Sequence, residues 1–204
     1  MRKIGIMGGT FDPIHNGHLM LAREAYKIYH LDEVWFMPNG RPPHKNIETI
    51  ESDVHHRVEM VKLAIEGHPE YHLETYEAFS ENTSYSYQTL EHFHNCNPDD
   101  EFYFIIGADS LFTLDSWVHP ERIFPICTIL AAYRDEIDTS GEMLEQIHKL
   151  ESSYESVDIR LMVTPLIHVS SHELRKKIKN GESIQKDVPE VVEAYIREHR
   201  LFGA

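Results

Sequence analysis

Short apolar runs recur along the chain at intervals of roughly 30 residues, the length of one strand–helix–strand unit, and amphipathic segments separate them. Most runs are continuous rather than alternating, as is typical of strands covered on both faces. We predict strands over Lys3–Met7, Val34–Met37, His72–Tyr76, Phe102–Ile106, Thr128–Tyr133 and Arg160–Val163. Helical spacing of apolar residues predicts helices over His18–Tyr29, Val54–Ile65, Tyr85–Phe93 and Gly141–Leu150. This alternation predicts an α/β fold, a Rossmann-like doubly wound parallel sheet.

The C-terminal third of the chain shows a helical pattern. Ser170 precedes an apolar-periodic segment and Glu173 follows three positions later, which predicts a helix capped by Ser170. The pair Asn180-Gly181 predicts the end of that helix, and a last helix is expected from Pro189 to about His199. The sequence shows no internal repeat and no flexible linker. We therefore expect a single domain over residues 1–204, with a helical C-terminal part from about 165 to 204.

The charge balance of the 204 residues is strongly acidic. Nineteen Lys and Arg residues face 34 Asp and Glu residues, giving a formal net charge of −15. A nucleic-acid-binding protein needs a basic footprint, so no nucleic-acid partner is expected. An anionic ligand would have to be attracted by a local cluster of cations and backbone N–H groups.

The chain carries no sign of export or membrane insertion. The first predicted strand begins at Lys3, which leaves no room for a signal peptide, and the longest nearly apolar stretch, Ile123–Tyr133, is too short to span a bilayer. Cys96 and Cys127 are far apart and form no C-x-x-C pattern. We expect a cytoplasmic protein with reduced thiols and no membrane contact. A lone disulfide is the less favoured alternative for the cysteines, and the sequence leaves a homo-oligomer open.

The most informative segment runs from Gly8 to His18, reading G-G-T-F-D-P-I-H-N-G-H directly after an apolar run. The pattern predicts a buried strand, a glycine turn and a helix start, where unpaired backbone N–H groups favour an anion. His15 and His18 are three positions apart and point to one side of that helix. We interpret the segment as a phosphate-binding site. Metal binding by the two histidines, or hydrogen bonding of the helix start, are the alternatives.

The glycine spacing excludes two common nucleotide-binding motifs. No Gly-Lys-Ser/Thr follows the turn, so it is not a Walker A loop. The glycines at positions 5, 8 and 9 do not form G-x-G-x-x-G, which disfavours an NAD-dependent oxidoreductase. The remaining histidines show no metal-ligand spacing, so we predict no metal held by the protein.

Three further positions carry candidate chemistry. Arg175 lies in the second turn of the helix that Ser170 caps, where it would reach phosphates; the alternative is a solvated basic face with Lys176, Lys177 and Lys179. Asp109, after a buried strand, would accept a hydrogen bond from a ribose hydroxyl, or else cap a helix over Ser110–Leu114. Trp117 would stack on a cationic ring, or else fill the core.

The G-T-F-D-P-x-H-x-G-H block resembles the H-x-G-H signature of the nucleotidyltransferase superfamily, and S-S-H-E-L-R at 170–175 resembles its S-S-T-x-I-R element. Over nearly its full length the chain is similar to bacterial nicotinate mononucleotide adenylyltransferases. The supporting segments are Pro42-Pro43-His44-Lys45, Ser84-Tyr85-Ser86-Tyr87, Ile105-Ile106-Gly107-Ala108-Asp109 and Trp117. Ser86, Val118 and His172 depart from the usual family residues.

The resemblance implies transfer of AMP from ATP to nicotinate mononucleotide, giving deamido-NAD and pyrophosphate without a covalent intermediate. It implies catalytic roles for His15, His18, Lys45 and Arg175. It implies ATP binding by Gly8, Gly9, Thr10, Phe11, Gly107, Asp109, Ser170 and Ser171. It implies nicotinate mononucleotide binding by His44, Ser86, Trp117 and Arg134. Mg²⁺ is expected to arrive with ATP rather than in a protein cage.

Two alternatives remain, one a related enzyme and one from a different functional class. One is a relative that uses phosphopantetheine or a CTP-linked alcohol phosphate, but such chains tend to be shorter and lack the Pro-Pro-His-Lys and Trp117 features. The other is a catalytically idle nucleotide-binding regulator, which the retention of both histidines, Lys45 and Arg175 disfavours.

Overall fold

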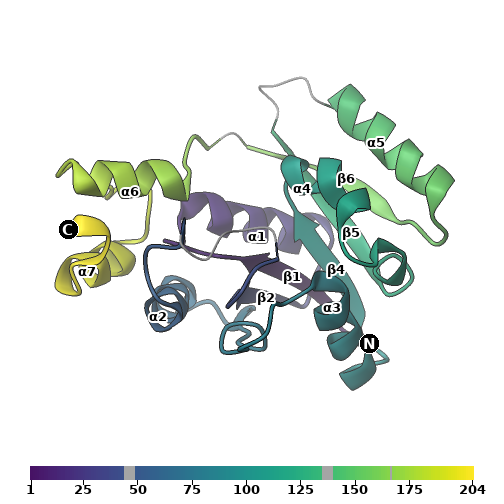
Figure 1. The fold of residues 1–204 in the computed structure, drawn as a ribbon, viewed down its shortest axis with the longest axis horizontal. Coiled ribbons are helices and arrows are strands. Elements are labelled where there is room, and N and C mark those ends of the chain that lie inside the picture. The colour runs from purple at the N-terminus through teal and green to yellow at the C-terminus, as the bar shows by residue number, and fades with distance from the viewer. Residues whose placement is uncertain (44–48, 135–139, 166) are drawn as a thin grey trace. The chain divides into compact units, whose positions relative to one another are not determined.

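The computed structural model describes residues 1–43, 49–134, 140–165 and 167–204. It contains one six-stranded sheet with the strand order β3-β2-β1-β4-β5-β6 (Figure 1). The strands are β1 Lys3–Gly9, β2 Glu33–Pro38, β3 Tyr71–Leu73, β4 Glu101–Ile106, β5 Cys127–Arg134 and β6 Ile159–Thr164. The pairs β1/β4, β4/β5 and β5/β6 are parallel. Because the order reverses at β1, this is the doubly wound Rossmann-like sheet that the sequence predicted.

The helices predicted from periodicity are present, and a short helix overlaps the Ser110–Leu114 segment that was offered as an alternative. Those described are α1 Asn16–Ile28, α2 Val54–Ile65, α3 Ser86–Cys96, α4 Ala108–Thr113, α5 Ser140–Ser153, α6 Ser171–Lys179 and α7 Glu190–Glu198. Single 3₁₀ turns cover Leu114–Ser116, Pro120–Arg122 and Leu201–Gly203. The third strand covers Tyr71–Leu73 rather than His72–Tyr76, and a turn follows in which the Ala78 N–H donates to the Thr75 carbonyl.

The chain folds into two compact units, each built from several segments. The first unit consists of Met1–Met7, Leu21–Val34 and Tyr85–Leu166, and the second of Gly8–Met20, Trp35–Ser84 and Ile167–Ala204. The division falls within β1, α1 and β2, so each of these elements contributes residues to both units.

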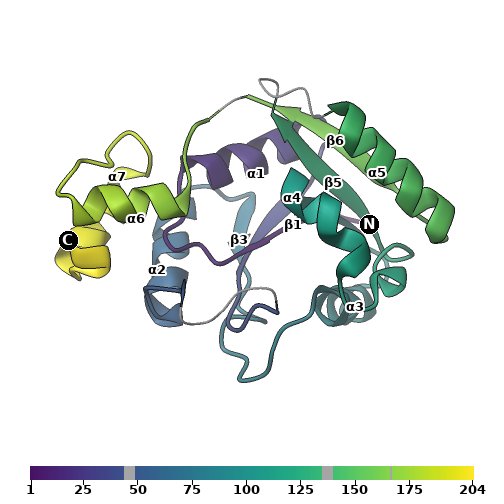
Figure 2. The same cartoon turned by 45° about the horizontal axis from the view of Figure 1, so that its top comes forward.

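The first unit has its core along the central strands. Ile129 of β5 is fully buried and pairs in register with Phe104 on β4 and Ile159 on β6. The helix α5 lies along β5 and β6 in both ribbon views (Figures 1 and 2), and buries Met143, Ile147 and Leu150. Continuous apolar runs therefore became strands that neighbouring strands and helices cover, as the pattern predicted.

The second unit contains the end of β1 and the C-terminal helices. The predicted glycine turn is wrong, because Gly8 and Gly9 continue the strand and the chain turns at Asp12-Pro13. The Ser170 hydroxyl accepts the Glu173 N–H at 3.2 Å, and Gly181 adopts a left-handed φ of 72° just after α6, so both predicted ends of this helix are confirmed. The helix α7 packs on α2, where His56 Nδ1 and the Tyr195 hydroxyl lie 2.8 Å apart. In the described part of the chain, every helix is too short or too polar to cross a membrane.

The buried position of Ile129 gives a stability prediction. We expect Ile129→Ala to lower the free energy of unfolding by about 3 kcal/mol, since it removes buried methyl groups and leaves a cavity. Urea unfolding followed by circular dichroism measures this change. Val163→Ala, at a β6 position that is 56% exposed, is the control and should change stability by less than about 0.5 kcal/mol. Equal losses in the two variants would contradict this account of the core.

The two cysteines are predicted to differ in reactivity. Burial, together with the nearby Asp158 carboxylate, raises the pKa of the Cys127 thiol to about 12, whereas Cys96 is exposed. Only the thiolate reacts with disulfide reagents. We therefore expect one thiol to react in the folded protein at pH 8 and both to react in denaturant. Labelling of Cys127 in the folded protein, seen by peptide mass spectrometry, would refute this.

Candidate functional site

Two imidazole rings stand at the start of α1. The rings of His15 and His18 are stacked, with centroids 3.7 Å apart and planes 24° apart. The backbone N–H of His15 donates to Nδ1 of the His18 ring, and the backbone N–H of Gly17 donates to Nδ1 of the His15 ring, each at 3.1 Å. Because Nδ1 accepts in both rings, each neutral ring carries its proton at Nε2. In each ring, Nδ1 therefore accepts a hydrogen bond from the helix start, and Nε2–H can donate to an anion. The two interpretations of the histidines are compatible.

The glycine between the histidines is required by close packing. A Cβ at Gly17 would lie 2.9 Å from His15 ring atoms and 3.0 Å from Val169 Cγ1. The spacing H-x-G-H thus lets the chain pass beside the His15 ring.

The Phe11 side chain is almost fully buried and meets the His18 ring edge-on, with centroids 4.9 Å apart. Its backbone has a positive φ of 52°, which is uncommon for a bulky residue.

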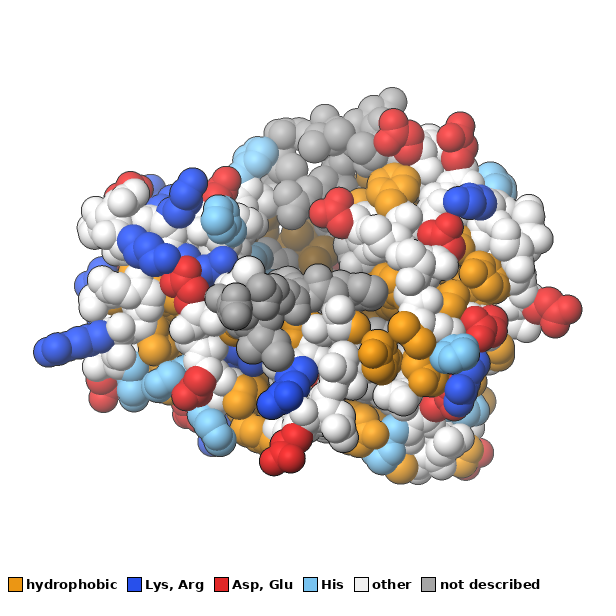
Figure 3. All heavy atoms as spheres, in the orientation of Figure 1, with side chains coloured by type: hydrophobic (Ala, Val, Ile, Leu, Met, Phe, Trp, Pro, Cys, Tyr) orange, Lys and Arg blue, Asp and Glu red, His pale blue; other side chains and the backbone are white. Residues whose placement is uncertain are grey.

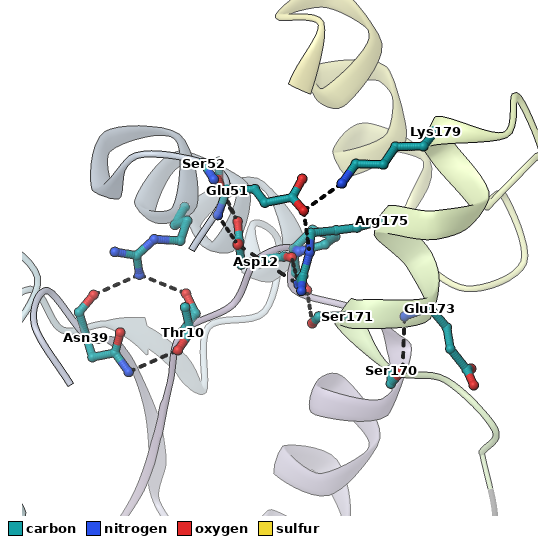
Figure 4. Close-up of polar contacts among 12 residues, drawn as sticks. Thr10, Asp12, Asn39, Glu51, Ser52, Ser170, Ser171, Glu173, Arg175 and Lys179 are labelled. Atoms are coloured by element: carbon teal, nitrogen blue, oxygen red, sulfur yellow. Dashed lines mark hydrogen bonds and ion pairs between the residues drawn. The ribbon is translucent and has the colours of Figure 1, made fainter. Parts of the chain in front are cut away.

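The start of α6 is bonded to the turn that follows β1 (Figure 4). The Ser171 hydroxyl donates to the Pro13 carbonyl at 2.9 Å. Arg175 Nη1 donates to the Asp12 carbonyl, also at 2.9 Å, and lies 4.0 Å from the Asp12 carboxylate. These contacts join the two motifs that are separated by about 150 residues in the sequence.

A cavity of about 380 Å³ opens between these segments of the second unit. It is lined by Gly9, Thr10, Phe11, Asp12, His18, Thr49, Ile50, Ser171 and Arg175. Six of these were predicted from the sequence, and Asp12, Thr49 and Ile50 were not. The volume is within the usual range for small-ligand sites.

Asp12 and Arg57 are buried charged residues that sequence reasoning missed. The Asp12 carboxylate accepts the Ser52 hydroxyl at 2.6 Å and the Glu51 N–H at 2.8 Å. The Arg57 guanidinium donates to the carbonyls of Thr10 and Asn39 at 2.8 and 2.7 Å. Burial lowers the pKa of Arg57 below its ordinary value, opposed by the charges of Asp12 and Asp53, but an arginine remains charged.

One sequence signal pointed to Arg57. It lies four residues before Val61 and eight before Ile65, so the predicted helix Val54–Ile65 carries a cation on its apolar face. A buried charge is costly unless it is paired or hydrogen-bonded, which indicates a specific structural task. That task is to hold together the two loops that carry Thr10 and Asn39.

Arg175 does not belong to a solvated basic face, so that alternative is wrong. Its side chain is only 16% exposed, and its Nε lies 3.6 Å from the Glu51 carboxylate. Lys177 pairs with Asp187 at 3.1 Å and Lys179 with Glu51 at 2.7 Å, whereas Lys176 is exposed. In Figure 3, Lys and Arg side chains gather on the side of the molecule where Figure 1 places α6.

The second unit thus brings together most of the predicted phosphate-binding residues. These are Gly8, Gly9, Thr10, Phe11, His15, His18, Ser170, Ser171 and Arg175. His44 and Lys45 lie outside the described residues.

The first unit holds the other predicted site residues. Ser86 is the first residue of α3, and Arg134 is the last of β5. Gly107, not Asp109, is the N-cap of α4, so Asp109 lies in the first helical turn and the capping alternative is wrong. Trp117 is half-buried, meets Phe104 edge-on with centroids 6.1 Å apart, and donates from Nε1 to the Thr113 hydroxyl at 3.4 Å.

Comparison with known proteins places this geometry in a family. Residues 6–177 match the sequence profile of the cytidylyltransferase-like family. The chain is 44% identical to the probable nicotinate-nucleotide adenylyltransferase of Lachnoclostridium phytofermentans, over 99% of this chain and 100% of that protein. It is 38% identical to the protein of the same name from Geobacillus thermodenitrificans, over 100% of this chain and 88% of that protein.

Solved structures share the fold. The chain matches the Plasmodium falciparum nicotinic acid mononucleotide adenylyltransferase complexed with APC, with a TM-score of 0.79 and 20% identity, over 99% of this chain and 98% of the other. The same protein complexed with NaAD gives a TM-score of 0.79 and 22% identity over the same shares. From the profile and the sequence identity, this chain belongs to the cytidylyltransferase-like family and, within it, to the nicotinate-nucleotide adenylyltransferases.

Proposed function

We propose that this chain transfers AMP from ATP to nicotinate mononucleotide, giving deamido-NAD and pyrophosphate, and that the cavity of the second unit holds the triphosphate. The observation that carries the proposal is the pair of stacked imidazoles, which present their Nε2–H side because Nδ1 of each accepts a backbone N–H. His18 lines the same cavity as Arg175 and the Gly9–Thr10 segment. The names of the relatives agree with this reaction.

The chemistry needs donors rather than a base. The second pKa of a phosphomonoester is near 6, so the attacking oxygen of nicotinate mononucleotide is already anionic at pH 7. That oxygen forms a bond to the α-phosphorus of ATP, and the bond from this phosphorus to the bridging oxygen of pyrophosphate breaks. Negative charge grows on the α-phosphoryl oxygens and the leaving group, where preorganised donors lower the barrier.

In this proposal each element of the second unit has one task. His15 and His18 donate from Nε2 to the phosphoryl oxygens, and the phosphates lie along the end of β1 and the loop after it, at Gly8, Gly9, Thr10 and Phe11. Arg175 neutralises the leaving pyrophosphate. Ser170 and Ser171 set the start of α6, whose first N–H groups add further donors. Lys45 would contribute a second cation.

The first unit supplies the proposed contacts to the sugars and the pyridine. Asp109 and Gly107 bind the adenylate ribose, and Trp117 stacks on the cationic pyridine. The Ser86 amide, at the start of α3, and an amide next to Trp117 donate to the nicotinate carboxylate; Arg134 and His44 add weaker contacts. Two N–H donors suit a carboxylate better than a carboxamide, which would favour the acid over the amide.

The setting of the reaction is also part of the proposal. No grouping of three or more His, Cys, Asp or Glu residues suited to a metal occurs among residues 1–43, 49–134, 140–165 and 167–204. We therefore write the nucleotide substrate as MgATP, with Mg²⁺ bound to its phosphates. Residues 1–204 act as one nucleotidyltransferase domain, since β1, α1 and β2 each contribute to both units. The two free thiols suit the cytoplasm.

The substrate assignment is tested by offering alternative acceptors. Purified protein with MgATP is given nicotinate mononucleotide, nicotinamide mononucleotide or phosphopantetheine, and both pyrophosphate and the new adduct are measured. We expect the fastest turnover with nicotinate mononucleotide, because its carboxylate accepts from two N–H groups. Faster turnover of either other acceptor would overturn the assignment.

The donor role of the histidines is tested separately. We expect His18→Ala to lower kcat by at least ~10²-fold, the scale of losing one transition-state donor, with a smaller effect on KM. His148→Ala, which changes a side chain that is 74% exposed on α5, is the matched control and should leave kcat unchanged. A normal kcat in His18→Ala, with unaltered thermal stability, would exclude this mechanism.

A further inference from the structure

One carboxylate bridges two cations of α6 beside the cavity. Glu51 Oε1 lies 2.7 Å from Lys179 Nζ and 3.6 Å from Arg175 Nε, and Figure 4 shows the Glu51 side chain reaching to both. Arg175 and Lys179 are four positions apart, so they lie on the same side of the helix. Arg175 lines the cavity that we assign to the triphosphate. The Glu51 carboxylate thus lies where an anion can pair with both Arg175 and Lys179.

The backbone beneath this carboxylate is fixed, while its side chain is accessible. The Glu51 N–H donates to the buried Asp12 carboxylate at 2.8 Å, and the next residue, Ser52, bonds to the same carboxylate. Asp53 then caps α2 through the N–H groups of His55 and His56. The Glu51 side chain is 33% exposed and that of Lys179 is 52% exposed. A rotation of the Glu51 side chain would therefore free both cations without moving the loop backbone.

One hydrogen-bond donor of Arg175, its Nε–H, has no acceptor among the described residues. This nitrogen is buried, although Glu51 neutralises the charge of the guanidinium from 3.6 Å. A terminal phosphate group, which carries more charge than a carboxylate and has several acceptor oxygens, would satisfy Nε and the Lys179 ammonium together. Ion pairs between exposed groups are weak in water, so a polyanion can displace Glu51.

We propose that Arg175 and Lys179 form a two-cation site for the terminal phosphates of the nucleotide, and that the Glu51 carboxylate occupies this site until the triphosphate displaces it. Lys179 is then a substrate-binding residue that the family motif, which ends at Arg175, does not include. Glu51 acts as an internal competitor: it keeps two cations positioned in a protein of net charge −15 and yields them to a more highly charged ligand. The assignment of the phosphates to ATP rests on the proposed function.

The site is probed with inorganic tripolyphosphate, which needs neither adenine recognition nor an acceptor. Binding of tripolyphosphate, ATP and AMP is measured by isothermal titration calorimetry in EDTA and again with Mg²⁺. We expect Lys179→Met to weaken tripolyphosphate and ATP binding on the order of tenfold, the scale of one charge-assisted hydrogen bond, and to leave AMP binding unchanged. We expect Glu51→Gln to tighten tripolyphosphate binding by about threefold, the scale of an exposed ion pair.

Two controls keep the charge changes matched. Lys176→Met removes an exposed cation from the same helix, and Glu182→Gln removes an exposed anion just beyond it. Each control should change tripolyphosphate affinity only by the small amount that follows from changing the net charge of the protein by one. Equal weakening by Lys176→Met and Lys179→Met would overturn the proposal, as would weaker binding in Glu51→Gln. Thermal melting confirms that each variant folds.

The outcome is separable from that of the proposed function. If the wild-type protein makes no deamido-NAD but loses tripolyphosphate binding in Lys179→Met, the reaction is misassigned and the two-cation site stands. If it makes deamido-NAD and Lys179→Met binds tripolyphosphate normally, the reaction stands and the two-cation site is wrong.

Discussion

The candidate site depends on two backbone N–H groups that donate to imidazole nitrogens. Those of His15 and Gly17 fix Nδ1 of His18 and His15 as acceptors. Each ring is thereby oriented, and its remaining N–H is at Nε2. The helix start thus orients the rings that are proposed to act on its ligand.

Positive charge comes from elsewhere in the second unit. Arg175 and Lys179 lie on α6, and Arg57 lies beneath the turn that follows β1. In a chain with a net charge of −15, these three side chains bring positive charge to the surroundings of the cavity. Asp12 is the central acceptor of this grouping, since its carboxylate fixes the Glu51–Ser52 backbone and its carbonyl binds Arg175. Acidic residues here position the basic ones.

The sequence sufficed for the sheet because continuous apolar runs and helical periodicity are local signals. The cap at Ser170 and the end at Gly181 were predictable for the same reason, since each needs one residue type in one conformation. The helix at Ala108–Thr113 is six residues long and had too few turns for a periodic signal. Asp12, Glu51 and Asn39 were missed because their partners are distant in sequence or are backbone atoms, which no residue pattern reveals.

The contact between α7 and α2 links the C-terminal helices to the loop that follows β1. The Tyr195 hydroxyl meets His56, whose neighbour Arg57 reaches the Thr10 carbonyl in that loop. A change of the Tyr195 side chain would therefore act on α2 at the residue before Arg57, the residue whose guanidinium binds the Thr10 and Asn39 carbonyls.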